Sequence, residues 1–100
     1  MKLVSAVVRT MSLERIVKSL ETAGVKHLTI FEIKGVGEQV QLFTPYSVHR
    51  MIQVIIPDER VHEITSVIVD NAHTGLAGDG FIVVLAVEHM INIQTMESMV

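Results

Sequence analysis

Three glycines and an aspartate stand directly before a run of β-branched residues in the stretch HTGLAGDGFIVVLAVEHM, residues 73–90. Gly75, Gly78 and Gly80 permit backbone conformations that larger residues resist, so successive N–H groups can turn toward one point and hold an anion. The next residue is Phe81, which carries no charge. The turn therefore has the backbone of an anion site without a cation beside it.

The other reactive residue types form no catalytic or metal-binding pattern. The five histidines show neither the HxH nor the HExxH spacing of a metal site: His27, His49, His62, His73 and His89. The absence of cysteine excludes a disulfide framework, a zinc ribbon and a thiol nucleophile. No nucleophile stands beside a base, and no carboxylates cluster. The sequence predicts neither a catalytic residue nor a metal ligand.

The composition limits the class of protein. A chain of 100 residues predicts one domain, residues 1–100, and its net charge of -3 gives no reason to expect nucleic-acid binding. The N-terminus lacks the pattern of a signal peptide and no apolar run reaches transmembrane length, so we expect a cytoplasmic protein without direct membrane insertion. An apolar fraction of 49% is high for so short a chain and favours a subunit interface.

The elements that must position the turn are predicted in two similar halves. The first half reads as a strand at 3–8, a helix capped by Ser12 and ended by Gly24, a strand at 25–34, and an irregular stretch at 35–50. The apolar stripe of that helix consists of Leu13, Ile16, Val17 and Leu20.

The second half repeats this order. It reads as a strand at 51–56, a helix beginning at Pro57-Asp58 with Asp58 as the cap, and a strand at 81–87. Residues 91–94 extend the last strand or form a short one of their own. The inward stripe of the second helix consists of Val61, Ile64, Val67 and Ile68. The order βαββαβ predicts an α+β, ferredoxin-like split βαβ fold.

This topology also accounts for the apolar excess. Two helices cover one face of a four-stranded sheet, yet the first and last strands are apolar on both faces. Such strands are typical of sheets that are buried on both sides. Other copies of the same chain are the simplest cover, so we expect a closed homo-oligomer.

The motifs FEIKGVGEQ (31–39), VIIPDE (54–59) and TGLAGDG (74–80), in this order around this topology, resemble the P-II signal-transduction superfamily. The resemblance covers almost the full chain. It implies a homotrimer that binds adenine nucleotides in clefts between subunits, and a long loop, the T-loop, that docks onto transporters or enzymes. It also implies regulation without catalysis.

The resemblance assigns a ligand site residue by residue. Gly35, Gly37 and Gln39 match the motif at the base of the family's loop, and Thr29 matches a position near the adenine. Gly78, Asp79 and Gly80 match the turn that faces the phosphates, and His49 stands where the family has a lysine that contacts 2-oxoglutarate and phosphate groups. These eight residues are the predicted ligand-binding residues of the cleft.

Three cations of the family's nucleotide site are replaced in this chain. The lysine after the turn is Phe81, and two arginines of the closing strand are Asn92 and Gln94. Because a hydrogen bond to a charged group is worth about 1.5–3 kcal/mol, losing three weakens binding by roughly three to six orders of magnitude if the losses add. We therefore expect ATP to bind weakly or not at all, and predict no firm cofactor.

Two interpretations of the glycine turn follow. In the first it is a structural connection between the second helix and the last strand. In the second it is retained for a less charged ligand, such as a nucleoside or AMP. A working anion site needs a cation from elsewhere, and Arg9, Lys34 and Arg50 are the available candidates.

The loop at residues 36–48, VGEQVQLFTPYSV, is shorter than the family's T-loop. Its tyrosine, Tyr46, does not match the position that is covalently modified in the family. Leu42, Phe43 and Tyr46, together with Pro45, form an apolar group typical of a contact surface. We predict that Leu42, Phe43 and Tyr46 bind the protein partner, a membrane transporter or an enzyme.

Three functions remain open at this point. The first is a non-catalytic P-II-like regulator that binds a partner protein under the control of a small ligand. The second is a structural adaptor trimer whose ligand site has decayed. The third is a metal-responsive trimer in which symmetry brings His49 or other histidines together.

Overall fold

The structure confirms the ferredoxin-like α+β fold, with its elements in the order βαββαβ. The computed structural model describes residues 1–35 and 49–100. Its elements are the strands β1 (Lys2–Arg9), β2 (Thr29–Glu32), β3 (His49–Ile56) and β4 (Gly80–Ala86), the helices α1 (Leu13–Thr22) and α2 (Val61–Ala72), and the 3₁₀ turns η1 (Thr10–Ser12) and η2 (Asp58–Arg60).

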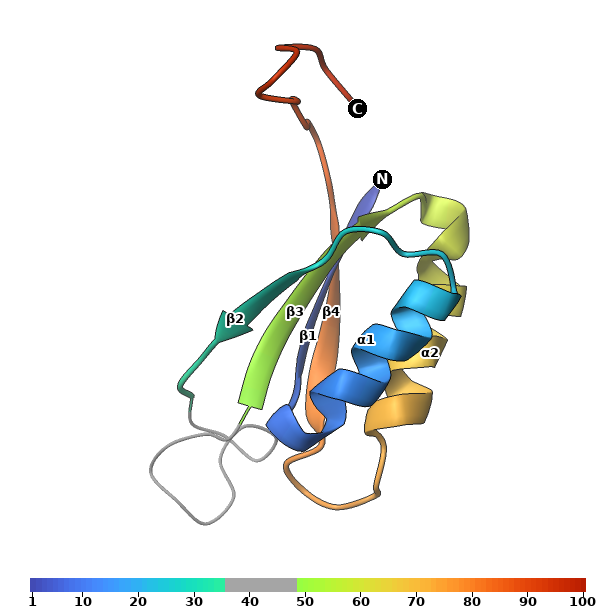
Figure 1. Cartoon of the computed structure of the whole chain (residues 1–100), viewed down its shortest axis with the longest axis vertical. Helices are drawn as coiled ribbons and strands as arrows, with labels where there is room; N and C mark the ends of the chain where they lie inside the picture. Colours follow the sequence, from blue (N-terminus) through green and yellow to red (C-terminus); the bar gives the residue numbers. More distant parts are fainter. Residues whose placement is uncertain (36–48) are drawn as a thin grey trace.

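The four strands form one antiparallel sheet in the order β2-β3-β1-β4. β1 is central, since it pairs with β3 on one side and with β4 on the other. Figure 1 shows α1 and α2 on the same side of this sheet. The other face of the sheet carries no helix from the described part of the chain.

The hydrophobic core lies between the helices and the sheet. Alternate residues of β1 and β3 face the helices, because successive side chains of a strand point to opposite faces. The centres of the predicted helical stripes are fully buried, with Ile16, Leu20, Ile64 and Ile68 at most 1% exposed. Leu13, Val61 and Val67 pack at the margin of this core.

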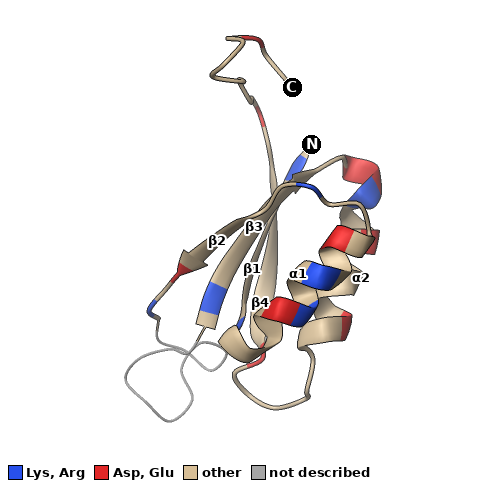
Figure 2. Cartoon of the chain, in the orientation of Figure 1, with Lys and Arg blue, Asp and Glu red and all other residues tan. Residues whose placement is uncertain are grey.

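The face away from the helices, called the open face below, is mostly apolar and partly exposed, with Ser5 and Gln53 as a polar pair within it. Strand register places Phe31, Met51, Val7 and Phe81 in one row across all four strands. The large exposed side chains of this face are Phe31, Ile55, Phe81, Val83 and Leu85, at 40 to 46% exposure. Figure 2 shows the charged residues on the helices and near the strand ends, with the middle of the sheet uncharged. The helices thus cover one face only, as predicted.

Gly24 ends α1 as predicted. Its φ is +90°, its N–H donates to the carbonyl of Glu21 at 3.0 Å, and the N–H of Val25 donates to the carbonyl of Leu20 at 2.9 Å. These two bonds form a Schellman motif, in which a left-handed glycine reverses the chain. Val25 is buried after this reversal. The motif therefore returns the chain from α1 toward β2.

Of the two predicted helix caps, Ser12 occupies the position directly before α1 but makes no capping bond within the described part of the chain, and Asp58 is wrong. Ser12 is helical, at φ −90° and ψ −13°, and is buried in η1 without a capping bond from its side chain among the described residues. Asp58 belongs to η2, where its carboxylate accepts a hydrogen bond from the amino group of Met1 at 2.8 Å. A 3₁₀ turn precedes each α-helix, so the residues that were expected to cap lie inside a helical segment.

Strand boundaries differ from the prediction where pairing sets them. β2 covers only Thr29–Glu32 rather than 25–34, because its pairing with β3 runs from Thr29 opposite Gln53 to Glu32 opposite Arg50. β3 begins at His49 rather than at 51, because Arg9 of β1 pairs with His49. Cross-strand partners, rather than local β-propensity, fix these ends.

The C-terminal segment, residues 87–100, leads away from the sheet (Figure 1). The prediction for 91–94 is wrong in part, since Ile91 forms an isolated bridge with Ser98 while the chain between them turns. Asn92 causes that turn, because its side-chain oxygen accepts from the Thr95 N–H at 3.2 Å and its carbonyl accepts from the Met96 N–H at 2.7 Å. The exposed apolar side chains of this segment are Ile91, Ile93, Met96, Met99 and Val100.

Candidate functional site

The glycine turn, residues 73–80, connects α2 to β4. Gly75, Gly78 and Gly80 have φ values of +87°, +97° and +113°, a region that other residues rarely adopt. At Gly80 space is also decisive, since an added Cβ would lie 1.8 Å from the carbonyl oxygen of Val7. The backbone of the turn thus presses directly against β1, and position 80 accepts only glycine.

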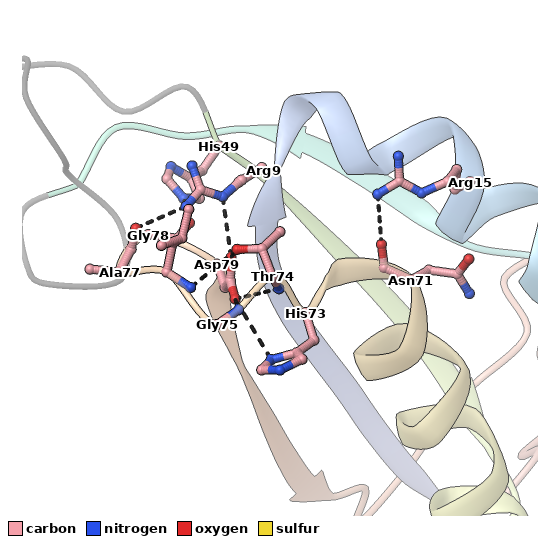
Figure 3. Close-up of polar contacts among 11 residues, drawn as sticks. Arg9, Arg15, His49, Asn71, His73, Thr74, Gly75, Ala77, Gly78 and Asp79 are labelled. Carbon is pink, nitrogen blue, oxygen red and sulfur yellow. Dashed lines mark hydrogen bonds and ion pairs between the residues drawn. The ribbon is translucent and has the colours of Figure 1, made fainter.

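The Asp79 carboxylate occupies the middle of this turn (Figure 3). Its Oδ2 accepts from the backbone N–H groups of Thr74 at 2.7 Å and Gly75 at 2.9 Å. Its Oδ1 accepts from the Thr74 hydroxyl and, at 3.4 Å, from Nε of Arg9. The N–H groups of Thr74 and Gly75 therefore hold an anion that the turn itself supplies.

Hydrogen bonding stabilises the charged form of Asp79. The bonds from the side chain and then the backbone of Thr74 lower the pKa of this carboxyl strongly, and those from Gly75 and Arg9 act in the same direction. Partial removal from water opposes them but is outweighed. The imidazole of His73 also lies near, with Nδ1 3.8 Å from Oδ2 of Asp79. Asp79 is consequently an anion at neutral pH.

Arg9 is the cation that reaches the turn. Besides its contact with Asp79, its Nη2 donates to the carbonyl of Ala77 at 2.8 Å, and its guanidinium would lie 3.1 Å from a Cβ at Gly78. Arg50, another candidate, instead contacts the Thr10 hydroxyl at 3.2 Å and lies 3.6 Å from Oε1 of Glu32. Of these two arginines only Arg9 contacts the turn, through a bond with the turn's own aspartate.

His49 joins the turn to β3. Its side chain is 1% exposed, and its Nε2–H donates to the carbonyl of Gly78 at 2.6 Å. His49 is the first residue of β3 and directly follows residues 36–48. It therefore couples the chain after that loop to the backbone of the glycine turn (Figure 3).

The predicted ligand residues separate into two groups. His49, Gly78, Asp79 and Gly80 lie together at the glycine turn. Thr29 lies in β2, separated from β4 by β3 and β1, a spacing of roughly 14 Å at about 4.8 Å between strands. Gly35 follows β2 among the described residues, while the predicted residues Gly37, Gln39, Leu42, Phe43 and Tyr46 lie outside them.

Two further residues complete the turn and were not predicted. The hydroxyl and N–H of Thr74 are the principal partners of Asp79, and the carbonyl of Ala77 accepts from Arg9. A threonine five residues before an aspartate in a glycine-rich turn is a usable signal, since short polar side chains bond to nearby backbone. The carbonyl of Ala77 leaves no such signal, because every residue has one.

A pocket of about 220 Å³ lies beside the turn, between the C-terminal part of α2 and the start of β4. Ile68, Val69 and Ala72 line it from α2, Ile82 lines it from β4, and His73 and Asp79 lie at the turn. The pocket is apolar with two ionisable groups at one end. Its position is separate from Thr29 and β2.

The described residues contain no group of three His, Cys, Asp or Glu side chains that could hold a metal ion. A metal site of the third predicted kind would therefore need more than one chain or the loop at 36–48. Among the described helices, none combines the length and apolar character required to cross a membrane.

Comparison with known proteins identifies the family. A family model described as "Nitrogen regulatory protein P-II" matches residues 1–97. The chain is 34% identical to the nitrogen regulatory protein GlnK of Escherichia coli, an alignment that covers 98% of this chain and 96% of the relative. It is 32% identical to the nitrogen regulatory protein P-II 2 of Methanothermobacter thermautotrophicus, over 98% of this chain and 93% of the relative.

A third relative is the nitrogen regulatory protein P-II of Haemophilus influenzae, at 34% identity over 97% of this chain and 95% of that protein. Both the family match and the relatives thus extend over nearly the whole chain, including the glycine turn and all four strands. Together they show that this chain belongs to the nitrogen regulatory protein P-II family, whose members are regulatory, non-enzymatic signal transducers.

Proposed function

We propose that this protein is a cytoplasmic, homotrimeric P-II regulator that binds a transporter or enzyme under the control of a small ligand between subunits. In this proposal residues 36–48 provide the docking surface, through Leu42, Phe43 and Tyr46. Family membership supports regulation without catalysis. The assembly, the ligand cleft and the docking are proposed from this chain's own residues.

The observation that carries the proposal is the open face of the sheet. Five large apolar side chains there are at least 40% exposed, as described above, whereas Val4, Ile52 and Val54 on the helix side of the same sheet are at most 3% exposed. Exposed apolar surface of this extent on a small domain favours burial by another subunit. Three copies with their open faces inward would give each sheet a second cover.

The geometry of the chain ends supports a site shared between copies. Asn92 and Gln94 lie in the C-terminal segment, beyond the Ala86 end of β4, whereas the glycine turn lies at the opposite, Gly80 end of the same strand (Figure 1). The chain extends 46 Å along its longest axis. Positions that the family brings to one ligand therefore lie far apart within one chain, and a second copy would have to supply one set.

Sedimentation equilibrium at micromolar concentration tests the assembly. We expect a species of three times the 11.1 kDa chain mass. A stable monomer would contradict the proposal, because the open face would then remain exposed to water.

Partner capture tests the docking surface. The wild-type protein and a Phe43→Ala/Tyr46→Ala double variant are used to capture partners from the native cytoplasmic and membrane fractions. We expect the double variant to lose a partner that the wild type retains, since apolar anchors carry most of the binding energy of a small interface. Equal retention by both would exclude this loop as the contact surface. A Leu76→Ala variant is a matched control, because Leu76 is also an apolar loop residue and is 69% exposed.

The second candidate function is a structural adaptor trimer without ligand control. One observation favours it: Asp79 takes the N–H groups of Thr74 and Gly75, which would otherwise point at a ligand. If the protein is such an adaptor, the amount of partner that it captures should not change when a small molecule is added. Repeating the capture with adenine nucleotides and with 2-oxoglutarate separates the two functions, since only the regulator responds.

A further inference from the structure

Phe31 and Phe81 are the two phenylalanines of the described part of the chain, and they lie at opposite ends of one row of the sheet. Phe31 in β2 is opposite Met51, Met51 is opposite Val7, and Val7 is opposite Phe81 in β4. Both rings belong to the open face, at 40% and 46% exposure. Their backbones are separated by roughly 14 Å, at about 4.8 Å between strands, so Met51 and Val7 lie between the two rings of one chain.

The strands that carry these rings are the two edges of the described sheet. β2 and β4 each pair with one other strand of that sheet. β4, with the sequence GFIVVLA, contains neither a charged residue nor a proline. Edge strands of soluble proteins usually carry such residues, which prevent pairing with other chains. An apolar edge strand of this length is therefore typical of a strand that another chain covers.

We propose that Phe31 of one copy packs against Phe81 of the next copy, and that this aromatic pair joins neighbouring sheets in the assembly. In a closed ring of three copies, each interface joins two different surfaces of the chain. The β2 edge and the β4 edge of the sheet are two such surfaces, and each presents one ring on the same face. Two aromatic rings bury a large apolar area and attract each other in edge-to-face or offset-stacked geometry.

The surroundings of each ring suit an apolar contact. Glu32, the residue after Phe31, points to the other face of the sheet, and its Oε1 lies 3.6 Å from Nη2 of Arg50 in the same chain. Val83, the next open-face residue of β4 after Phe81, is also apolar and is 43% exposed. A place in the interface accounts for an uncharged side chain at position 81, where an anion site would have a cation.

This inference deepens the proposed assembly and rests on it, but the two fail in different ways. A wild-type protein that sediments as a monomer would overturn the proposed assembly, and the aromatic contact with it. A wild-type trimer in which Phe31 and Phe81 act independently would leave the proposed assembly standing and overturn the aromatic contact alone.

The first experiment is a double-mutant cycle on trimer dissociation, measured by sedimentation of a dilution series. We expect Phe31→Ala and Phe81→Ala each to raise the concentration of half-assembly by at least about tenfold, since buried aromatic anchors dominate interface energies. The double variant should assemble almost as well as either single variant, whereas effects this far apart in one chain ordinarily add. Ile30→Ala is the matched control, because Ile30 is 47% exposed on the opposite face of β2, and it should assemble as the wild type does. Single variants that assemble like the wild type, or additive effects, would overturn the inference.

The second experiment uses the absence of cysteine from the chain to test the contact directly. Phe31→Cys and Phe81→Cys are made as separate proteins, unfolded, refolded as a mixture and treated with a short bismaleimide. We expect a cross-linked dimer that contains one chain of each variant, identified by mass spectrometry. A mixture of Ile30→Cys with Phe81→Cys is the control and should give much less of the mixed dimer. Equal yields from the two mixtures, or no mixed dimer from the first, would overturn the inference.

Discussion

In the glycine turn, polar groups find their partners within one chain. Asp79 accepts from Thr74, Gly75 and Arg9, and the Gly78 carbonyl accepts from His49. On the open face of the sheet, by contrast, large apolar side chains are left without cover from the described part of the chain. The polar groups of the turn are satisfied within one chain, whereas the open face is left uncovered. The open face is therefore the surface that the proposed assembly would bury.

The largest expected effect comes from placing the same charge on the two faces of the sheet. Ile52 is 1% exposed beneath the helices, and Val83 is 43% exposed on the open face. Ile52→Asp places an unpaired charge in the core. The cost of burying that charge is comparable with the whole stability of a small domain, roughly 5–15 kcal/mol, so the chain should unfold. Circular dichroism measures this directly.

Val83→Asp should instead leave each chain folded and prevent trimer formation, as seen by sedimentation. Val84 is not suitable for this test, because its register partner Val4 faces the core. A Val83→Asp protein that remained trimeric would show that the open face is not the interface.

A second test concerns how tightly the turn is built. Gly80→Ala and Gly24→Ala both place a Cβ at a positive φ, but only at Gly80 would this atom meet backbone, 1.8 Å from the Val7 oxygen. Gly24→Ala should cost about 1 kcal/mol, from backbone strain alone. Gly80→Ala should cost clearly more, because the turn and β1 must separate. Equal urea midpoints for Gly80→Ala and Gly24→Ala would show that the turn packs less tightly against β1 than the short distance to the Val7 oxygen indicates.

A third test sharpens the question of nucleotide binding. Isothermal titration calorimetry of the wild type with ATP should give weak or undetectable binding, because Phe81, Asn92 and Gln94 replace cations. Phe81→Lys should strengthen binding by roughly ten- to a hundredfold, the value of one hydrogen bond to a charged group at about 1.5–3 kcal/mol. A low-micromolar dissociation constant for the wild type would contradict this prediction, and Phe81→Met serves as an uncharged control.

The smallest expected effect is the pH dependence of the turn. The pKa of Asp79 is lowered from its ordinary value of 3.8, chiefly by hydrogen bonds from Thr74. Its contribution to stability is therefore fully present above pH 4 and is lost as the pH falls below 3.8 through the folded pKa. Urea midpoints of the wild type should fall more steeply below pH 4 than those of Asp79→Asn. Parallel curves would mean that Asp79 titrates alike in the folded and unfolded chain.

Most of the fold was predictable because it follows from local patterns. The helical stripes around Ile16 and Ile64 and the glycine stop at Gly24 are readable from spacing and residue type. The start of α1 at Leu13, directly after Ser12, was also predictable, whereas the start of α2 at Val61 was not, because the 3₁₀ turn η2 includes Asp58 and delays the α-helix.

The site was predictable only in part. The family motif drew attention to Gly78, Asp79 and Gly80, and these do lie together with His49. The motif assigned Asp79 to a turn that faces a ligand's phosphates, whereas the carboxylate faces the donors of its own turn. Spacing cannot separate these cases, since the direction of a side chain depends on the backbone angles around it.

The sequence by itself determined the ferredoxin-like order of elements, the family, and the apolar excess that one layer of helices cannot cover. These depend on periodicity and composition, which are properties of neighbouring residues. Only the tertiary structure decided that Arg9 pairs with Asp79, 70 positions away, and that His49 bonds to the Gly78 carbonyl. Such contacts arise from the register of β1 against β3 and β4, and register follows from the packing of the whole sheet.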